Sequence, residues 1–330
     1  MLNETLHFAY QWRKKLGLFE HSGPRATEAI RIFYGPGESA HPELKQIAID
    51  LFKNHAWITV WGKVNDTCLN QVVSFLNALT LSGENTKIAS IVFMDRSEVA
   101  SQADVKTISG TPPTEKFSVT EFGVPYFIKF SETKHPGLFL DHAPLRAWLK
   151  DAGRDQSVLN LFSYTGSLSS AAGMGGASRV TTLDLSKSTI EWAEENWKLA
   201  GLDPSKGNFI YGDVFEWLPR FLKKNDSYDI ILCDPPSFSR SKNGTFSTAK
   251  DSMRLHELIF PLLNKGGVLV TSINSENYPE HRFLADIHAA AENLHTKIKI
   301  LKRVDLPETF PTSSEKIAER YLKGFYILKL

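Results

Sequence analysis

The sequence predicts an α/β protein whose larger part is a seven-stranded, doubly wound sheet and whose smaller N-terminal part is an α+β domain. From Ser157 onward, strand-like apolar runs alternate with stretches of helical periodicity, the pattern of a parallel sheet with helices on both faces. Upstream of Ser157 the elements follow one another less regularly. A chain of 330 residues, 42% of them hydrophobic, is long enough for two domains. We therefore expect an N-terminal domain over 1–115, a hairpin and linking helix over 116–150, and the doubly wound domain over 151–330.

The N-terminal domain is expected to mix helices with strands. Its helices are predicted at Glu4–Leu16, Pro42–Phe52 and Asp66–Leu81, and its strands at Ala29–Tyr34, Ala56–Val64 and Ile88–Met94. The stretch Ser97–Lys116 has no apolar periodicity and contains Gly110, Pro112 and Pro113, so we expect a linker or mobile loop. A hairpin about Gly123 should follow, with strands at Phe117–Glu121 and Tyr126–Phe130.

The doubly wound domain is predicted from seven short apolar runs with helical stretches between them. The strands are expected at Val158–Ser163, Arg179–Leu185, Asn208–Gly212, Tyr228–Asp234, Val268–Ile273, Lys297–Val304 and Gly324–Leu330. Between the second and third runs, Ile190, Ala193 and Trp197 recur at helical spacing. The expected arrangement is Rossmann-like.

Composition limits the classes of protein that fit. No run approaches the roughly 20 apolar residues of a spanning helix, and the N-terminus lacks a signal-peptide core, so a cytoplasmic location is expected. Cys68 and Cys233 are the two cysteines, which favours neither a disulfide framework nor a metal site. The net charge is +1, so any contact with nucleic acid must be local. Three candidate patches combine basic residues: Arg13, Lys14 and Lys15 beside Trp12; Arg240, Lys242, Lys250 and Arg254; and Lys316, Arg320 and Lys323.

Polar residues follow four of the predicted strands, at the edge where a doubly wound sheet binds its ligand. The first strand runs into Asn160-Leu-Phe-Ser-Tyr-Thr-Gly166, a turn with a single glycine. Asp184 ends the second strand, Asp213 the third, and Asp234-Pro-Pro236 the fourth. Any one of them could be only a helix cap or a turn. Together they predict a ligand site.

The glycine turn indicates which ligand this is. Asp184 lies eighteen residues after Gly166, a spacing at which an acid can accept hydrogen bonds from ribose hydroxyls, as it also does for nicotinamide cofactors. A dinucleotide pyrophosphate favours a G-x-G-x-x-G run, which is missing here. S-adenosylmethionine has no phosphate and needs no such run. Ser163, Thr165 and Gly166 can then serve its methionine end, and Asp213 its adenine amino group.

The sequence Asp234-Pro-Pro-Ser-Phe238 predicts the acceptor site. Its prolines remove ladder donors and fix the backbone after a buried strand. Asp234 and nearby carbonyls can hold the polar edge of an acceptor, and Phe238 can stack on a base. The following segment, Ser237–Arg254, is rich in serine and basic residues, so we expect a mobile flap that closes on RNA through Arg240, Lys242, Lys250 and Arg254.

Nearly the whole chain resembles the large-subunit ribosomal RNA methyltransferases, most closely the K half of the fused K/L enzyme. The resemblance is carried by Phe8-Ala-Tyr-Gln-Trp-Arg-Lys-Lys15, Ala29-Ile-Arg-Ile-Phe-Tyr34, Gly137-Leu-Phe-Leu-Asp-His142 with Arg146, Leu159–Gly166, Leu183–Ser186, Asp234-Pro-Pro-Ser-Phe-Ser-Arg-Ser-Lys242 and Asp305-Leu-Pro-Glu308. It implies methylation of guanine N7 in 23S rRNA with S-adenosylmethionine, and an α+β domain over 1–115 that binds RNA or substrate.

The resemblance also adds Leu140 and Asp141 to the cofactor site. The expected catalytic residues are Asp234, Pro235, Pro236 and Phe238. The expected cofactor residues are Leu140, Asp141, Asn160, Phe162, Ser163, Tyr164, Thr165, Gly166, Asp184, Leu185, Ser186, Gly212, Asp213, Val214 and Asp234.

Other functions stay open at this point. The related I enzyme methylates cytosine C5 through a cysteine after the fifth strand, where this chain has Thr271-Ser-Ile-Asn274. Cys233 should face away from Asp234 into the core, because neighbouring strand residues point to opposite faces. Guanine N7 has an exposed lone pair and needs only alignment, so no dedicated base is required. His142, His256 and His281 are expected to be packed or surface residues. The alternatives are a cytosine-C5 enzyme, a nicotinamide-dependent reductase and a non-catalytic RNA-binding assembly factor.

Overall fold

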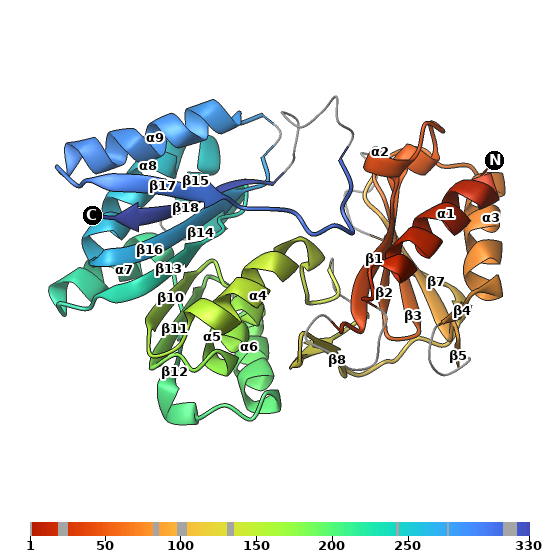
Figure 1. Ribbon diagram of the computed structural model, residues 1–330, viewed down its shortest axis with the longest axis horizontal. Coiled ribbons are helices and arrows are strands. Elements are labelled where there is room, and N and C mark those ends of the chain that lie inside the picture. The colour runs from red at the N-terminus through yellow and green to blue at the C-terminus, as the bar shows by residue number, and fades with distance from the viewer. Residues whose placement is uncertain are drawn as a thin grey trace. The chain divides into compact units, whose positions relative to one another are not determined.

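The chain forms two compact units (Figure 1). The structure is a computed structural model that describes residues 2–18, 26–81, 86–97, 104–130, 135–241, 244–275, 277–312 and 322–330. One unit comprises Met1–Ala143 with Leu306–Ile317, and the other Pro144–Asp305 with Ala318–Leu330. This division differs from the expected one at 115 and 150, because the hairpin at 117–128 belongs to the first unit and a segment after Asp305 returns to it.

The first unit is built on a five-stranded sheet with the order β1-β2-β3-β6-β7. Its strands are β1 (Ala29–Tyr34), β2 (Ile47–Phe52), β3 (His55–Val60), β6 (Ser90–Asp95) and β7 (Asp104–Gly110). β3 and β6 pair in parallel and the other neighbours are antiparallel. Helices α1 (Leu2–Lys15) and α3 (Asp66–Ala78) bury their apolar side chains against the sheet. Shorter elements are α2 (Gly35–Glu38), η1 (Leu44–Gln46), β4 (Thr80–Leu81), β5 (Thr86–Lys87), β8 (Phe117–Glu121), β9 (Val124–Ile128) and η2 (Leu140–His142).

Two predictions for the first unit are wrong. The helix expected at Pro42–Phe52 is η1 followed by β2, whose six side chains are all buried. A short run that is apolar throughout cannot be distinguished from a buried helical turn by periodicity. The loop expected at Ser97–Lys116 includes strand β7, which pairs with β6 at the sheet edge and exposes most of its side chains. Residues 98–103 of that stretch lie outside the described part of the chain.

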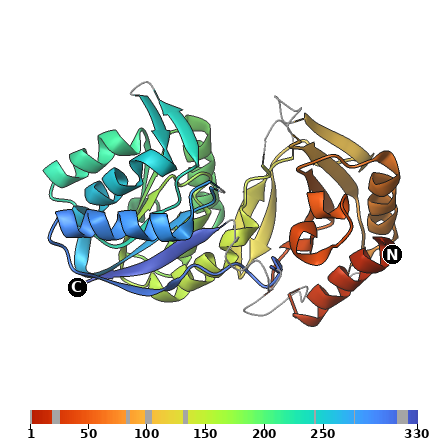
Figure 2. The same cartoon turned by 90° about the horizontal axis from the view of Figure 1, so that it is seen from above.

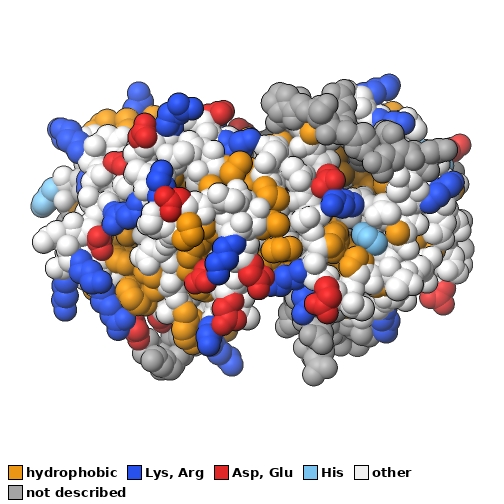
Figure 3. Space-filling model, turned by 90° about the horizontal axis from the view of Figure 1, so that it is seen from below, with side chains coloured by type: hydrophobic (Ala, Val, Ile, Leu, Met, Phe, Trp, Pro, Cys, Tyr) orange, Lys and Arg blue, Asp and Glu red, His pale blue; other side chains and the backbone are white. Residues whose placement is uncertain are grey.

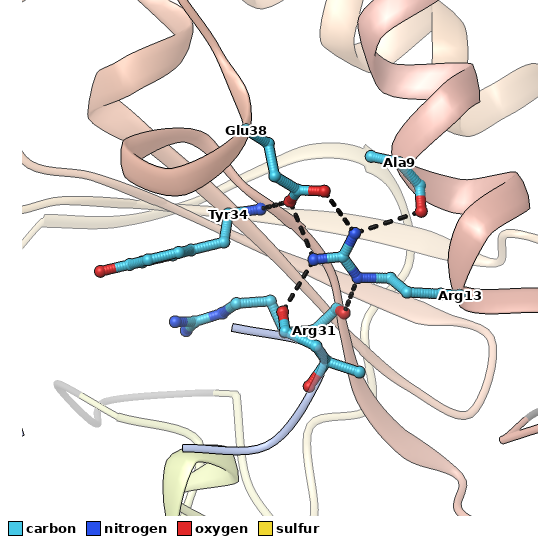
Figure 4. Close-up of polar contacts among 6 residues, drawn as sticks. Ala9, Arg13, Arg31, Tyr34 and Glu38 are labelled. Atoms are coloured by element: carbon cyan, nitrogen blue, oxygen red, sulfur yellow. Dashed lines mark hydrogen bonds and ion pairs between the residues drawn. The ribbon is translucent and has the colours of Figure 1, made fainter. Parts of the chain in front are cut away.

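Arg13, a candidate for RNA contact in the sequence, is instead a buried structural residue (Figure 4). Its guanidinium forms a two-point ion pair with Glu38, at 2.6 and 2.8 Å. Its remaining N–H groups donate to the carbonyls of Ala9, Arg31 and Thr309 at 2.6 to 3.1 Å. All five donors of the guanidinium are therefore used within the first unit. Thr309 belongs to the segment that returns after Asp305, so Arg13 fastens that segment to α1 and β1.

The second unit is the predicted doubly wound domain. Its sheet has the order β12-β11-β10-β13-β16-β18-β17, with the first five strands parallel and β18 antiparallel to both neighbours. The strands are β10 (Ser157–Leu161), β11 (Arg179–Asp184), β12 (Gly207–Tyr211), β13 (Tyr228–Cys233), β16 (Leu263–Ile273), β17 (Ile298–Arg303) and β18 (Lys323–Lys329). All seven were predicted, six of them within two residues at each end; β16 begins five residues earlier than expected.

Helices cover both faces of this sheet (Figures 1 and 2). Helices α7 (Val214–Lys223), α8 (Thr248–Ile259) and α9 (Glu280–Asn293) share the larger core of the unit with the sheet. Helices α4 (Ala143–Ala152), α5 (Ser167–Met174) and α6 (Lys187–Leu199) lie on the opposite face. From β10 the chain adds β11 and β12 on one side of the sheet and then returns to add β13 on the other side of β10. The carboxyl ends of β10 and β13 are therefore the topological switch point. No described helix in either unit has the length and apolar character needed to cross a membrane.

Candidate cofactor and acceptor site

The turn after β10 has an unusual backbone. Phe162, Tyr164 and Gly166 have φ values of 55°, 50° and 68°, so three of five consecutive residues are left-handed. This conformation costs about 1 to 3 kcal/mol for each non-glycine residue and persists only where the surroundings enforce it. Here the Ser163 N–H donates to the Leu183 carbonyl at 3.1 Å, and the Tyr164 N–H donates to Asp184 Oδ2 at 2.8 Å. Strand β11 therefore holds the turn that follows β10 in place.

Two glycines bring backbone close to the predicted ligand edge. Gly166 begins α5, and a Cβ there would lie 2.6 Å from the Cβ of Ala193 on α6. A Cβ on Gly212 would overlap the indole nitrogen of Trp217. Both positions therefore exclude a side chain, because Ala193 and Trp217 already occupy the space that a Cβ would need.

Asp184 links the turns at the ends of β10 and β11. Besides Tyr164, its carboxylate accepts hydrogen bonds from the Ser186 N–H at 2.9 Å and from the Thr189 hydroxyl at 3.1 Å. Burial raises the pKa of Asp184, and these hydrogen bonds partly oppose that rise. The residue is therefore both an anchor for the turns and a half-buried acceptor at the predicted ribose position.

The Ser163 hydroxyl gives the clearest indication that a polar group of a ligand binds in this turn. Its hydroxyl is buried and has no hydrogen-bond partner in the described chain. Buried polar atoms are almost always satisfied, so an orphan in a turn of this kind indicates a position for a polar ligand group. Neighbouring polar groups are used internally: the Asn160 amide donates to Ser169 Oγ at 2.9 Å, and the Asn196 amide donates to the Thr165 carbonyl at 2.9 Å.

The third strand completes this edge. Asp213 caps α7 by accepting the Phe215 N–H at 2.9 Å, and the Gly212 N–H donates to the Asp184 carbonyl at 2.9 Å. Val214 is buried and Leu185 is half-buried, so apolar side chains lie next to Asp184 and Asp213 in the sequence. Of the expected cofactor residues, those from Asn160 to Val214 are brought together at the ends of β10, β11 and β12. Leu140 and Asp141 form part of η2 in the first unit, and their role stays a prediction.

The Asp-Pro-Pro turn is held from two directions. Ser272, at the end of β16, donates to Asp234 Oδ1 at 2.6 Å. Thr248, at the start of α8, donates its hydroxyl to the Pro236 carbonyl at 2.8 Å and its N–H to the Ser237 carbonyl at 3.2 Å. Both Ser272 and Thr248 are buried. Sequence reasoning missed both as supports, because their partners lie 38 and 12 residues away and no local pattern reveals such pairs.

The segment Ser237–Arg254 is not the unstructured flap that we expected. It forms the antiparallel hairpin β14 (Phe238–Ser241) and β15 (Gly244–Ser247), followed by α8. Phe246 is its buried anchor, with its ring centroid 5.7 Å from those of both Phe162 and Phe215. That one aromatic side chain supplies the apolar contact that the composition seemed to lack.

The exposed side of the hairpin carries the expected acceptor groups. Phe238 is 53% exposed, and the Arg240 guanidinium lies 5.4 Å from its ring centroid. Lys250 and Arg254 are exposed on α8, with the Arg254 guanidinium 4.8 Å from the Phe215 ring. Lys242 lies outside the described residues. Over the one face of the molecule that Figure 3 shows, basic and acidic side chains are interspersed.

The cysteines and histidines have the packed or surface positions that we predicted. Cys233 is 1% exposed, and burial raises the pKa of its thiol. His256 is buried and contacts Thr271 Oγ1 at 3.1 Å, whereas His281 is exposed and His142 is buried.

Comparison with known proteins agrees with this geometry. The chain matches the S-adenosylmethionine-dependent methyltransferase family over residues 30–320. It is 30% identical over 306 residues to YwbD of Bacillus subtilis, named as a candidate ribosomal RNA large subunit methyltransferase, covering 92% of this chain and 75% of that one. It is 38% identical to the ribosomal RNA large subunit methyltransferase K/L of Shewanella pealeana, covering 58% of this chain but only 26% of that one. The crystal structure of SMU.776, a candidate methyltransferase complexed with S-adenosylhomocysteine, superposes with a TM-score of 0.87 at 25% identity, covering 100% of this chain and 81% of that one.

The doubly wound sheet, its single-glycine turn and the acids at successive strand ends define an enzyme that binds a nucleoside-containing methyl donor. The chain belongs to the S-adenosylmethionine-dependent methyltransferase family. Its cofactor is S-adenosylmethionine, and the buried Ser163 hydroxyl without a partner and the Asp184 carboxylate at the end of β11 fit that group. A nicotinamide-dependent reductase is no longer a competing interpretation.

Proposed function

We propose that this enzyme methylates a base of ribosomal RNA and that the acceptor is N7 of guanine in 23S rRNA. The observation that carries the proposal is the rigid Asp234-Pro-Pro-Ser-Phe238 turn with an exposed aromatic ring and an anchored carboxylate at the switch point of the sheet. The names of the K/L, I and YwbD relatives support ribosomal RNA as the substrate. The chain spans about a quarter of the K/L relatives that it matches, so their activity comes to it as a proposal.

The site's own residues can perform the transfer by alignment. Asp234, fixed by Ser272, can accept hydrogen bonds from the amino edge of guanine, and Phe238 can stack on the ring for about 1 to 3 kcal/mol. Pro235 and Pro236 fix the turn between them. Bound S-adenosylmethionine supplies an electrophilic methyl group. Guanine N7 has a free lone pair, so orientation and exclusion of water suffice and no residue must remove a proton first.

Cytosine C5 is a poorer fit as the acceptor. That reaction requires a cysteine thiolate to add to C6 of the base, and the side chain at the corresponding strand end here is the Ser272 hydroxyl, already bound to Asp234. Cys233 is buried in the sheet with a raised pKa. Burial also raises the pKa of Cys68, to about 11, and Cys68 is part of the first unit. Neither thiol is a ready nucleophile at neutral pH.

The decisive experiment is to map modified nucleosides in rRNA from a strain that lacks this gene. We expect one 7-methylguanosine of 23S rRNA to disappear and to return when the purified enzyme and S-adenosylmethionine are added to that RNA. Cys233→Ser should retain turnover. A missing 5-methylcytidine, or a covalent complex with RNA that contains 5-fluorocytidine, would contradict the N7 proposal while leaving RNA methylation intact.

The basic residues after the Asp-Pro-Pro turn supply a second test. Replacing Arg240 and Lys250 by alanine should weaken RNA binding and reduce the salt dependence of log K by about 0.7 to 0.9 for each lost phosphate contact. S-adenosylmethionine affinity should not change. A salt slope equal to that of the wild type would show that this surface does not contact the phosphate backbone.

A further inference from the structure

The second unit has a cavity of about 580 Å³ that the cofactor and acceptor residues do not form. It lies between the edge strand β12 and helix α7. Tyr211 and Trp217 line one end, and Arg179, Lys224 and Asp226 line the other. Its size is within the usual range for a site that binds one small ligand. Among the described strands β12 pairs with β11 alone, so it is the edge strand of the sheet.

The first end presents an aromatic surface. Tyr211 is 58% exposed at the end of β12. Trp217 is half-buried, covers Gly212 and carries the Arg220 guanidinium 5.1 Å from its ring centroid. A large aromatic side chain exposed on an edge strand contributes little to the core. It does offer a flat surface on which a base can stack.

The other end carries positive charge. Arg179 is fixed by an ion pair to Asp226 at 3.3 Å and by a hydrogen bond to the Ser227 carbonyl at 3.0 Å. Asp226 is thereby neutralised, and the Lys224 ammonium has no ion-pair partner among the described residues. The helix dipole favours basic residues in the last turn of α7 but does not explain an arginine on the neighbouring strand β11. The cavity therefore keeps one net positive charge opposite its aromatic end.

We propose that this cavity binds a short stretch of single-stranded RNA, with one base stacked on Tyr211 and the phosphate of a neighbouring nucleotide near Lys224. The inference rests on the proposed RNA substrate and adds a contact outside the acceptor site. β12 and β13 are three strand spacings apart, about 14 Å, so nucleotides flanking the target base can reach the cavity. An aromatic platform beside a cation is the usual combination for sequence-tolerant binding of single strands.

Photo-cross-linking tests the contact directly. A 23S rRNA fragment that contains 4-thiouridine should cross-link to Tyr211, within the tryptic peptide Gly207–Arg220. Tyr211→Ala should raise the Kd for this RNA about 5- to 150-fold, the loss of one stacked base, and Tyr211→Phe should restore it. Lys224→Ala should also raise the Kd and reduce the salt slope. Turnover at saturating RNA and S-adenosylmethionine affinity should be unchanged in all three.

Lys187→Ala is the matched control, because Lys187 is a 74% exposed lysine on α6 of the same unit. Its RNA affinity should equal that of the wild type. If the wild type binds and methylates this RNA and both Tyr211→Ala and Lys224→Ala bind it equally well, this inference alone is overturned. Equal loss in Tyr211→Phe and Tyr211→Ala would overturn it too, because stacking does not need the hydroxyl. A wild type that binds S-adenosylmethionine but no rRNA fragment would overturn the proposed function as well.

Discussion

Asp184 combines two tasks that make opposite demands on its carboxylate. Its hydrogen bonds to the turns favour the ionised form, whereas burial raises its pKa. Ribose hydroxyls donate stronger hydrogen bonds to the ionised form, and protonation leaves fewer acceptor positions on the carboxyl group. S-adenosylmethionine affinity should therefore begin to fall on acidification at a pH above the ordinary Asp pKa of about 3.9, because the folded protein binds this proton more readily than a free side chain does.

Replacing Asp184 tests the same group without a change of pH. Asp184→Ala should weaken S-adenosylmethionine binding by about 1.5 to 3 kcal/mol, the usual loss for hydrogen bonds to a charged group. Asp184→Asn should remove the pH dependence while keeping one acceptor for the turns. Calorimetric titration measures both, with Asp203→Ala, an exposed cap of η3 (Pro204–Lys206), as the control. Unchanged affinity in Asp184→Ala would remove Asp184 from the cofactor site.

His256 predicts how the second unit responds to acid. Its Nδ1 lies 2.7 Å from the Ser252 carbonyl and must donate, so Nε2 accepts from Thr271, and both contacts suit the neutral ring. Burial lowers the pKa of His256 to about 4. The unfolded chain takes up this proton near pH 6.5. Between these values the unfolded state binds more protons, so the free energy of unfolding should fall as the pH drops, by at most about 3 kcal/mol.

The variant His256→Gln isolates this contribution. It should be less stable at pH 7, because the packed ring is lost, but its unfolding free energy should fall less between pH 7 and pH 5. Urea unfolding of both proteins at the two pH values gives the comparison. Parallel losses in the two proteins would mean that His256 does not titrate as its environment predicts.

Individual site residues were predictable where a single strand end carries the chemistry. Asp184 ends β11, and Gly166 and Asp213 lie in the turns that follow β10 and β12, so the alternation of strand and helix patterns located all three. Ser272 and Thr248 were not predictable as supports, because their hydrogen bonds join segments that only the sheet order and α8 bring together. From the sequence we could conclude that position 272 is not the cysteine of a cytosine-C5 enzyme. The hydrogen bond from Ser272 to Asp234 could not be predicted.

At the scale of elements, the position of the hairpin β14–β15 depends on the packing of one side chain, Phe246. Phe246→Ala removes the ring that packs on Phe162 and Phe215, and truncating a buried phenylalanine costs about 3 to 5 kcal/mol. We expect faster tryptic cleavage at Arg240 and weaker S-adenosylmethionine binding, since Phe162 belongs to the cofactor turn.

A substitution on the same hairpin provides the control for Phe246. Phe238→Ala removes a ring that is mostly exposed, so stability should change by no more than about 0.5 kcal/mol while RNA affinity falls. If Phe246→Ala left both proteolysis and cofactor affinity unchanged, the hairpin would be held by other contacts.

The elements also show where periodicity fails. Most strands of the second unit were predictable because they are short apolar runs bounded by turns, and the exposed edge strand β17 still alternates Ile298 and Ile300 with lysines. β2 was mistaken for a helix because both of its faces are buried, which removes the alternation that marks a strand. β7 was mistaken for a loop because an edge strand with exposed side chains has no apolar pattern, and its pairing with β6 is a tertiary event.

For the molecule as a whole, Arg13 is the most consequential buried group of the first unit. Arg13→Ala should destabilise this unit by about 3 to 5 kcal/mol, because it leaves the Glu38 carboxylate buried without its partner. Arg13→Lys should recover part of that loss, since one ammonium cannot replace two parallel hydrogen bonds. Thermal unfolding measures both variants. Lys14→Ala, a change at the exposed neighbour, should have little effect, and an equal loss there would contradict the role of Arg13.

The path of the chain through the two units has a consequence for biosynthesis. Arg13 can form its hydrogen bond to the Thr309 carbonyl only after Thr309 has been synthesised. Thr309 is added about 165 residues after Ala143, which takes roughly 10 to 30 s at ordinary elongation rates. In the second unit, β17 joins the sheet only through β18, so that sheet also closes late. Neither unit can finish folding while the other is being made. A nascent chain halted before Thr309 is therefore incomplete in both units at once, and exposes to chaperones and proteases two unfinished cores instead of one folded domain with a tail.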